Sequence, residues 1–405
     1  MHARVGGQAV LVGRPAGTSI RELCLDIAEL FDRARREDAA AWLLSPRAGV
    51  NETLLALRPR DGRRVEPADA ARAWLLTRWR VTEALSRMAA RATAAAATFW
   101  LEMYRELRRH IGDERLPYPL RTRLRGIAER CFRRSREAAF RPDARSEASR
   151  CLPAGAGAEL PSHVTERLAS HAARLGVAFD HPVVALEVCG APELFHDAVL
   201  ALVADGHTVV RIGDPRMGPL GYSASHANGR PAVIDLAAAA GRDPAISDPG
   251  IDVFILLKAR FVVCGSPGMQ AMACLTSTPC LLIGAIDPVA SYPARGDGLF
   301  TLKAAVERDT GRVVPVDELL TERYIAHLDD FAHRANAATE VTAAVREMYE
   351  GVAHGWTDSA GQLRFRSRVA GYAAGRAGAS VDGGAIDAMA AAGQGRLARV
   401  QADRP

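Results

Sequence analysis

The sequence IDVFILLKARFVVCGSPGMQAMACLTSTPCLLIGA spans Ile251 to Ala285 and contains three apolar runs. The runs cover residues 251–258, 261–264 and 279–283, and a short apolar segment with helical character joins the second run to the third. Unbroken apolar runs separated by a crossover are typical of parallel strands that are buried on both faces. We therefore predict that the three runs are strands of one α/β sheet.

A tight turn follows the second run and leads directly into the helical segment. Its residues, with the first residue of that segment, are Gly265, Ser266, Pro267, Gly268 and Met269. Backbone N–H groups at the start of a helix, together with the positive end of the helix dipole, can bind an anion such as a diphosphate. An ordinary strand-to-helix turn without a ligand is the alternative.

A second cluster of polar residues follows the β-rich run at residues 207–212, which a predicted helix at 193–203 precedes. The residues at its exit are Arg211, Gly213, Asp214 and Arg216. Ligands of open α/β sheets bind outside the carboxyl ends of the strands. Arginine suits bidentate phosphate recognition. We therefore expect this cluster to share one edge with the Ser266 turn and to bind a nucleotide or a phosphate-sugar.

Several motifs in this half of the chain carry a family resemblance. They are RIGDPRMGPL at 211–220, VIDLA at 233–237, IDVF at 251–254, ARF at 259–261 and Gly265-Ser266. Their order from Val183 to Val314 resembles a family of bacterial glycosyltransferases associated with surface-carbohydrate loci. That family is similar to the two-domain GT-B fold. Three segments depart from its pattern. Glu187-Val188-Cys189 replaces an expected His-x-Arg, Ser266-Pro267-Gly268 replaces an expected Ser-Gly-Pro, and the Asn expected after the next strand is absent around Ile283-Gly284.

The resemblance implies a GT-B-like α/β fold with two Rossmann-like domains, a helical insertion and a C-terminal helical segment. It implies a metal-independent glycosyltransferase that uses a nucleotide-sugar as substrate and has no cofactor. The implied donor-binding residues are Arg211, Gly213, Asp214, Arg216, Ile234, Asp235 and the turn Gly265, Ser266, Pro267, Gly268 and Met269. The departures favour an alternative, a degenerate scaffold or partner subunit, and a sugar-nucleotide epimerase is a third possibility.

Proton transfer to or from the acceptor requires a titratable group in the cleft. The candidates near the first strand of the second domain, which we place at residues 181–188, are His181 and Glu187. A histidine before a proline can equally be structural. Asp235 and Asp252 can either contact the nucleotide or cap helices, and Lys258 can neutralise phosphate or be a surface charge.

The domain organisation follows from composition and pattern. We predict an acceptor-side α/β domain at 1–150, a linker at 151–160 and a donor-binding α/β domain at 161–320. Helices follow at 321–372, and an Ala/Gly/Arg-rich tail, predicted to be disordered, covers 373–405. Within the first domain, strands at 8–13 and 41–44 flank a helix, and the expected acceptor-side loop residues are Gly13, Arg14 and Asn51. Val313-Val314 is expected to be a last short strand.

The composition excludes several classes of protein. With 405 residues, 48% of them hydrophobic and 24% charged, the chain is long enough for two domains and ordinary for a globular protein. The sequence contains no apolar run long enough to cross a membrane, and its start is too short and polar for a secretory signal. The seven cysteines lack ligand spacing, which favours reduced thiols and no metal site.

The region 72–150 is strongly basic. It contains 19 arginines against nine acidic residues, so its net charge is about +10. A basic helical face can attract an anionic membrane, although a solvated arginine-rich surface explains the same composition. We expect a cytoplasmic protein with peripheral contact at the inner face of the membrane. The expected acceptor is a carbohydrate or a lipid-linked molecule, and no recognised motif points to nucleic acid.

Overall fold

The computed structural model describes part of the chain. The described residues are 2–5, 8–13, 24, 27, 28, 30, 31, 34, 35, 38–43, 57–59, 127, 130, 157–242, 248, 250–286, 296–321, 324, 330–377 and 396–403. The chain divides into two compact units, residues 1–65 with 146–405, and residues 66–145. The predicted basic region falls mostly in the second unit and, except for the helical residues Ile127 and Arg130, lies outside the described residues.

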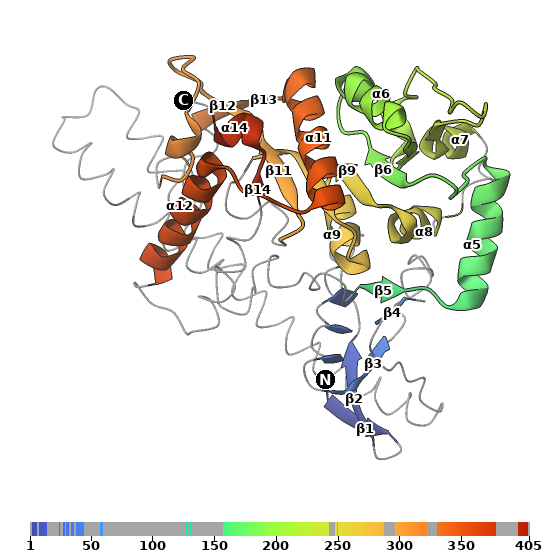
Figure 1. Ribbon diagram of the computed structural model, residues 1–405. Coiled ribbons are helices and arrows are strands. Elements are labelled where there is room, and N and C mark those ends of the chain that lie inside the picture. Colours follow the sequence, from blue (N-terminus) through green and yellow to red (C-terminus); the bar gives the residue numbers. More distant parts are fainter. Residues whose placement is uncertain are drawn as a thin grey trace. The chain divides into compact units, whose positions relative to one another are not determined.

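The first unit contains a seven-stranded sheet (Figure 1). Its strands, in spatial order, are β14 (Arg396–Leu397), β11 (Leu299–Leu302), β10 (Cys280–Ala285), β9 (Phe261–Cys264), β6 (Val183–Glu187), β7 (Thr208–Ile212) and β8 (Val233–Asp235). Every neighbouring pair is parallel. The predicted strands at 181–188, 207–212, 261–264 and 279–283 are confirmed.

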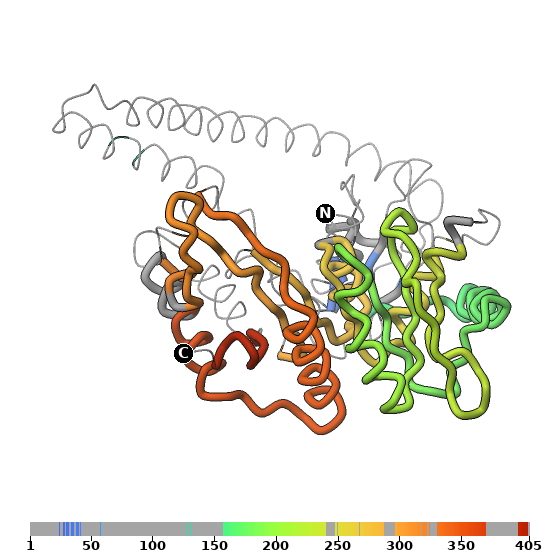
Figure 2. The backbone as a smooth tube through the Cα atoms, turned by 90° about the horizontal axis from the view of Figure 1, so that it is seen from above, coloured from blue at the N-terminus to red at the C-terminus, as the bar shows by residue number. Residues whose placement is uncertain are grey.

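The strand order contains a reversal. The chain begins at β6, moves outward to β7 and β8, and then returns to the other side of β6 to add β9, β10 and β11. Figure 2 shows the consequence, since residues coloured green lie at one end of this sheet and those coloured orange to red at the other. This is the doubly wound, Rossmann-like order, whose switch point lies between the first and fourth strands. The predicted α/β class is confirmed.

Helices cover both faces of the sheet because the strand residues alternate between them. Val184 and Leu186 of β6 pack with α6 (His196–Ala204) and α11 (Ala338–His354). Val183 and Ala185 belong to the other core, which includes residues of α5 (Ser162–Arg174), α8 (Ile251–Lys258) and α9 (Pro267–Thr276). Figure 1 shows α6 and α11 on one side and α8 and α9 on the other. Strands buried on both faces explain the unbroken apolar runs.

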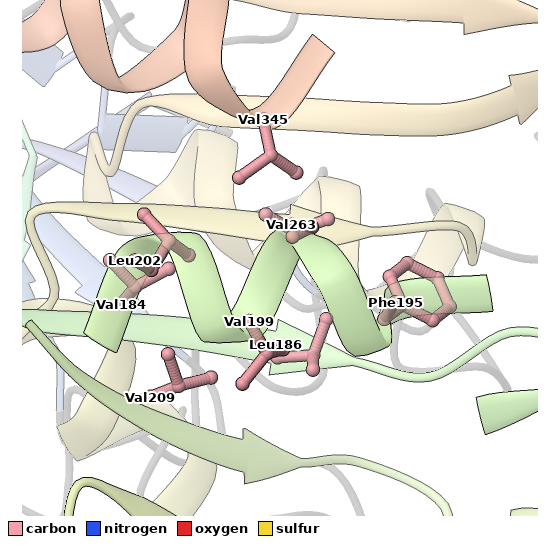
Figure 3. Close-up of a pocket in the computed structure, with 9 residues that line it drawn as sticks. Val184, Leu186, Phe195, Val199, Leu202, Val209, Val263 and Val345 are labelled. Carbon is pink, nitrogen blue, oxygen red and sulfur yellow. The ribbon is translucent and has the colours of Figure 1, made fainter. Parts of the chain in front are cut away.

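The core beneath α6 and α11 is nearly filled. A cavity of about 10 Å³ remains, and Figure 3 shows side chains of α6, α11 and three neighbouring strands around it. They include Phe195, Val199 and Leu202 around α6, Val345 of α11 and Val263 of β9. A wholly apolar space of this size offers no hydrogen bond to a water molecule. It is therefore a packing space of the core and no ligand site.

The prediction of a strand at 251–258 is wrong, because these residues form helix α8. Ile251, Val253, Phe254, Ile255 and Leu256 are all buried in it. A helix that is apolar around most of its circumference is a buried helix. A short apolar run can therefore belong to either element. Lys258 consequently ends a helix and is exposed there, and it does not end a strand.

Further elements accompany these helices and strands. They are η2 (Pro192–Phe195), η3 (Pro215–Met217), α7 (Leu236–Arg242), β12 (Ala304–Glu307), η4 (Val316–Glu318), β13 (Phe331–Arg334) and α12 (Ala360–Ala377). β12 and β13 pair antiparallel. Val313 forms only an isolated bridge to Val306, so the predicted strand at 313–314 is not formed. The predicted helices at 164–175 and 193–203 and around Val341 and Val345 are present.

The expectation that the chain is disordered from residue 373 onward is wrong for its described part. Helix α12 continues to Ala377, and β14 forms the outer strand of the seven-stranded sheet. A short helix, α14 (Arg399–Ala402), follows it. Composition suggested disorder, but a long-range pairing with β11 orders this segment.

Strands near the N-terminus form a separate three-stranded sheet. β2 (Gln8–Gly13) pairs in parallel with β3 (Ala40–Leu43), and β1 (His2–Val5) pairs antiparallel with β2. The described residues between β2 and β3 include helical ones, as the predicted β-α-β pattern requires. A further antiparallel pair joins β4 (Arg58–Pro59) to β5 (Ala158–Glu159). The predicted domain boundaries stay predictions.

Candidate functional site

The carboxyl ends of β6 and β9 meet at the switch point of the sheet. Glu187 ends β6, while Gly265 and Ser266 follow β9 and lead into α9. Ser266 is the N-cap of that helix, and its Oγ accepts a hydrogen bond from the backbone N–H of Met269 at 3.2 Å. Three of the predicted residues therefore lie where ligands of doubly wound sheets bind.

The carboxylate of Glu187 occupies this turn. Its Oε2 accepts hydrogen bonds from the backbone N–H groups of Gly265 at 3.2 Å and Ser266 at 2.9 Å. Its Oε1 accepts a third from the Ser266 hydroxyl at 2.5 Å. The turn thus binds a carboxylate of the same protein, and binding of a diphosphate there stays a prediction. Glu187 is buried and holds β6 to β9.

Two glycines allow this close packing. A Cβ at Gly265 would overlap the side chain of Cys189, so only glycine fits there. Gly213 has a φ of 94°, which side chains rarely adopt, and a Cβ there would lie 3.2 Å from Cγ of Glu187. Burial and the nearby Glu187 carboxylate raise the pKa of the Cys189 thiol to about 11. Cys189 is therefore a neutral packing residue and no nucleophile.

Asp252 is a second carboxyl group at this edge. It lies in the first turn of α8, half-buried, and accepts a hydrogen bond from the backbone N–H of Gly213. Burial raises the pKa of Asp252 to about 7; the hydrogen bond from Gly213 opposes this shift, and the charge of Glu187 contributes to it. A carboxyl group with this pKa can give or take a proton near neutral pH. From the sequence we predicted only that Asp252 caps a helix or contacts the nucleotide, because the sequence does not show that this side chain is buried.

Arg211 does not lie at an open edge, which corrects the prediction for this residue. Its side chain is fully buried, and its NH1 donates to both carboxylate oxygens of Asp235, at 3.1 and 2.9 Å. Its NH2 donates to the backbone oxygen of Asp214 at 3.3 Å. The guanidinium is therefore engaged in joining the ends of β7 and β8, where it cannot reach a diphosphate.

Asp235 organises the turns around these two strands. Besides Arg211, its carboxylate accepts hydrogen bonds from the backbone N–H groups of Leu220 at 3.0 Å and Ala238 at 2.9 Å. The second of these caps α7, so the capping alternative applies here. Ile234, the neighbouring predicted donor contact, is buried in the core. Neither residue projects into solvent as a nucleotide contact would require.

Asp214 and Arg216 form an exposed pair beyond the end of β7. The carboxylate accepts from the backbone N–H of Arg216 at 2.9 Å and from its NH2 at 2.7 Å. These bonds to Arg216 lower the pKa of Asp214 to about 2. The guanidinium of Arg216 is 87% exposed. Of the two predicted phosphate-binding arginines, Arg216 alone remains accessible to a ligand.

His181 lies at the opposite edge of the sheet from Glu187, which corrects their grouping in one cleft. It precedes β6, whereas Glu187 ends that strand, and a five-residue strand spans about 13 Å. His181 stacks on His226, with ring centroids 4.0 Å apart. Both line a surface cavity of about 440 Å³, together with Thr208 and Arg230. His181 therefore cannot exchange a proton with a ligand at the carboxyl edge.

The remaining predicted residues are only partly described. Gly13 ends β2, whereas Arg14 and Asn51 lie outside the described residues. Pro267, Gly268 and Met269 form the first turn of α9, with Met269 buried. Within the described part of the chain, no group of three His, Cys, Asp or Glu side chains could hold a metal ion. The described cysteines are free thiols: Cys24, Cys189, Cys264, Cys274 and Cys280.

No family model and no curated protein matches the sequence. The chain is similar to the solved ADP-heptose LPS heptosyltransferase II of E. coli at 11% identity and a TM-score of 0.37, covering 79% of this chain and 97% of that one. It is also similar to a family 9 glycosyl transferase from Veillonella parvula DSM 2008, at 10% identity and a TM-score of 0.37, covering 74% and 87%. Likenesses this distant carry no argument about activity.

No helix among the described residues has the length and apolar character needed to cross a membrane.

Proposed function

We propose that this chain is a glycosyltransferase that binds a nucleotide-sugar at the switch point between β6 and β9. The sugar would pass to a carbohydrate or lipid-linked acceptor. The observation that carries the proposal is the anion-binding turn at Gly265 and Ser266, which stands at the position where doubly wound sheets bind their ligands. The motif resemblance of residues 183–314 supports the same class of reaction.

The turn would act on the leaving group. In glycosyl transfer, negative charge develops on the nucleoside diphosphate as the glycosidic bond breaks. Two backbone N–H groups, the Ser266 hydroxyl and the N-terminus of the ten-residue helix α9 would stabilise that charge. The exposed guanidinium of Arg216 would add to this without a metal ion. Glu187 would first have to leave the turn, because its carboxylate uses the same donors.

Asp252 would accept the proton of the acceptor hydroxyl. Its carboxyl group lies at the same edge, bound to the Gly213 N–H, and its pKa of about 7 suits a general base at neutral pH. Glu187, which the sequence favoured for this role, is fully engaged with the turn. This role for Asp252 is part of the proposal.

Binding of nucleoside diphosphates tests the proposal directly. Calorimetric titration with UDP, GDP, ADP, CDP and dTDP should give saturable binding for at least one of them. Ser266→Ala should weaken that binding about tenfold, since it removes one hydrogen bond to a charged group. His181→Ala, at the opposite edge, is the matched control and should bind normally. The proposal is rejected if no nucleotide binds to the folded chain.

A second candidate function is a non-catalytic scaffold or partner subunit. Two observations favour it, the Glu187 carboxylate in the turn and the burial of Arg211. Under this candidate, the turn would hold its own carboxylate permanently, and added nucleotide would not displace it. Hydrolysis or transfer of a sugar-nucleotide by the purified chain would exclude the scaffold.

The basic region 72–150 would bring the enzyme to its acceptor. Its charge of about +10 would attract a membrane that contains anionic lipids, and a cytoplasmic position at the inner face follows from this proposal. Sedimentation with vesicles of phosphatidylcholine alone, and with added phosphatidylglycerol, tests it. Binding only to the anionic vesicles, and its loss at high salt, is the expected result.

A further inference from the structure

The segment Arg396–Asp403 packs along the outer edge of β11. Its backbone pairs with that strand, since Arg396 donates its N–H to Gly298 O at 3.2 Å and Ala398 donates its N–H to Phe300 O at 2.8 Å. Leu397 and Ala398 are completely buried. We call residues 396–403 the clasp segment; Figure 1 shows β14 and α14, which form it, beside β11 and α11.

Side chains extend this pairing beyond the two residues of β14. The amide of Gln401 accepts from the Leu302 N–H and donates to the Leu302 oxygen, both at 2.8 Å. In a longer parallel strand, two successive peptide groups would make these two bonds. The Leu397 oxygen accepts from Nε2 of Gln362 at 2.7 Å. The edge of β11 is thus closed along its whole length by a very short segment.

The surface that receives the segment is complementary to it in charge and shape. We call this surface the clasp groove and define it by β11 with Glu347, Asp358, Gly361 and Gln362. Asp358 accepts from Nε of Arg396 at 2.6 Å, and Glu347 accepts from the Arg399 N–H at 2.8 Å. Acidic groove residues therefore meet the two arginines of the segment.

Gly361 is the tightest point of the groove. Its N–H donates to Oδ1 of Asp403 at 3.0 Å. A Cβ at this position would overlap both Ala402 O and that same Oδ1. Gly361 also lies in the first turn of α12, where alanine would favour the helix. Gly361→Ala should therefore exclude the clasp segment while leaving α12 intact.

Eighteen residues of the sequence lie between α12 and the clasp segment. Residues 378–395 separate the end of α12 from Arg396. A connection of this length can span at most about 60 Å. The contacts described above join the segment to the groove and to Gly298, which directly precedes β11. A second copy of this chain presents an identical groove, which would receive the segment through the same contacts.

We propose that the clasp groove is a strand-addition site and that two copies of this chain are linked when one places its clasp segment in the groove of the other. Addition of an extended segment to a sheet edge is a common mode of recognition, and exchange of identical elements joins protomers at low cost. This inference is independent of the proposed glycosyl transfer. A segment tethered to its own groove has an effective concentration of about a millimolar. The exchanged form should therefore emerge when docking within one chain is blocked.

Two full-length variants test the exchange by complementation. The first, Gly361→Ala, has a blocked groove and an intact segment. The second, Arg396→Glu with Leu397→Asp, has an intact groove and a segment that cannot dock. Each should be monomeric alone by light scattering, and an equimolar mixture should form a one-to-one heterodimer. A mixture that keeps the mass of single chains, while circular dichroism shows both variants folded, overturns the proposal.

A matched control and a second measurement complete the test. Adding Leu397→Asp to the first variant should abolish the heterodimer, because the buried leucine is lost. If either variant fails to fold, the wild-type chain is titrated with a fluorescent peptide of residues 394–405. Fluorescence anisotropy should show incorporation, at least tenfold weaker for the peptide carrying Leu397→Asp. No incorporation at millimolar peptide overturns the proposal.

Discussion

The polar side chains at the carboxyl ends of the strands in the seven-stranded sheet, which form its carboxyl edge, make different contacts from those at the amino ends, which form its amino edge. At the carboxyl edge, Glu187 and Asp235 each accept two hydrogen bonds from backbone N–H groups of the adjoining turns. At the amino edge, His181 and His226 stack beside an open cavity. The difference arises because helices that follow parallel strands begin at the carboxyl edge, where their first N–H groups lack partners within the helix.

This comparison shows that donors able to bind phosphate also bind the carboxylates of their own chain. Glu187 and Asp235 each end a strand, and their carboxylates accept hydrogen bonds from backbone N–H groups of neighbouring turns. Ligand binding at such an edge is therefore a competition, and its outcome depends on how easily the internal carboxylate leaves. At the amino edge, the described polar side chains of His181, His226 and Thr208 contact one another.

The largest expected effect concerns Arg211 at the carboxyl edge. Arg211→Met should lower the free energy of unfolding by about 3–5 kcal/mol, because it leaves the partly buried Asp235 without its charged partner. Urea denaturation measures this loss. The double variant Arg211→Met with Asp235→Leu is the control and should recover much of the stability. A single variant as stable as wild type would mean that the ion pair does not hold β7 to β8.

The next largest effect is the pH dependence contributed by Asp252. Its pKa rises from 3.8 in the unfolded chain to about 7 in the folded one, so the folded chain binds more protons between these values. Stability should therefore fall as pH rises from about 4 to 7 and then level off. Asp252→Asn should remove this slope and stabilise the chain by about 2–3 kcal/mol at pH 8. Thermal denaturation across this range measures both, and equal slopes for the two proteins would refute the raised pKa.

A smaller effect is expected when the internal carboxylate is removed from the turn. Glu187→Ala should cost about 1–2 kcal/mol in unfolding free energy, since three hydrogen bonds are lost and water replaces some of them. The same variant should bind nucleoside diphosphates more tightly than wild type, because the donors are free. Glu187→Gln, which keeps an acceptor, should be intermediate. Unchanged affinity in calorimetry would place the nucleotide elsewhere.

The smallest effect is expected at the amino edge. His181→Ala should leave nucleotide affinity within a factor of about two, because this residue lies about 13 Å or more from the carboxyl edge along β6. Calorimetric titration of the His181→Ala and Glu187→Ala variants with the same nucleotide compares the two affinities directly. A large loss of affinity on replacing His181 would show that the nucleotide binds in the cavity at this edge.

Much of the sheet could be predicted from the sequence because its strands are buried on both faces. The segment from Phe261 to Ile283 contains its own boundaries, a serine N-cap after one strand and a β-rich run after the helix. Residues 251–258 could not be assigned in this way. Six of these eight residues are apolar, and a short apolar run fits a buried helix and a buried strand equally, because no periodicity separates the two.

The candidate site was predictable in position but not in its contacts. The sequence located the turn at Ser266 correctly, since a glycine-containing turn after a strand marks the carboxyl edge. It could not show that Arg211 meets Asp235, because that contact requires β7 and β8 to be neighbours. It also placed His181 and Glu187 in one cleft, because they are close in the sequence. The structure excludes this grouping, because the two residues lie at opposite ends of β6. Strand addition by Arg396–Leu397 depends on a distant partner in the same way.

The Gln401 amide beside Leu302 has a consequence for solubility. Strand β11, with the sequence Leu-Phe-Thr-Leu, is apolar and rich in residues that favour β structure. An open edge of this kind invites sheet growth from one molecule to the next, which leads to aggregates. The Gln401 side chain accepts from the Leu302 N–H of that edge and shares the Leu302 oxygen with Nδ2 of Asn336. One glutamine thus completes a barrier to amyloid-like association that the two residues of β14 alone would leave incomplete.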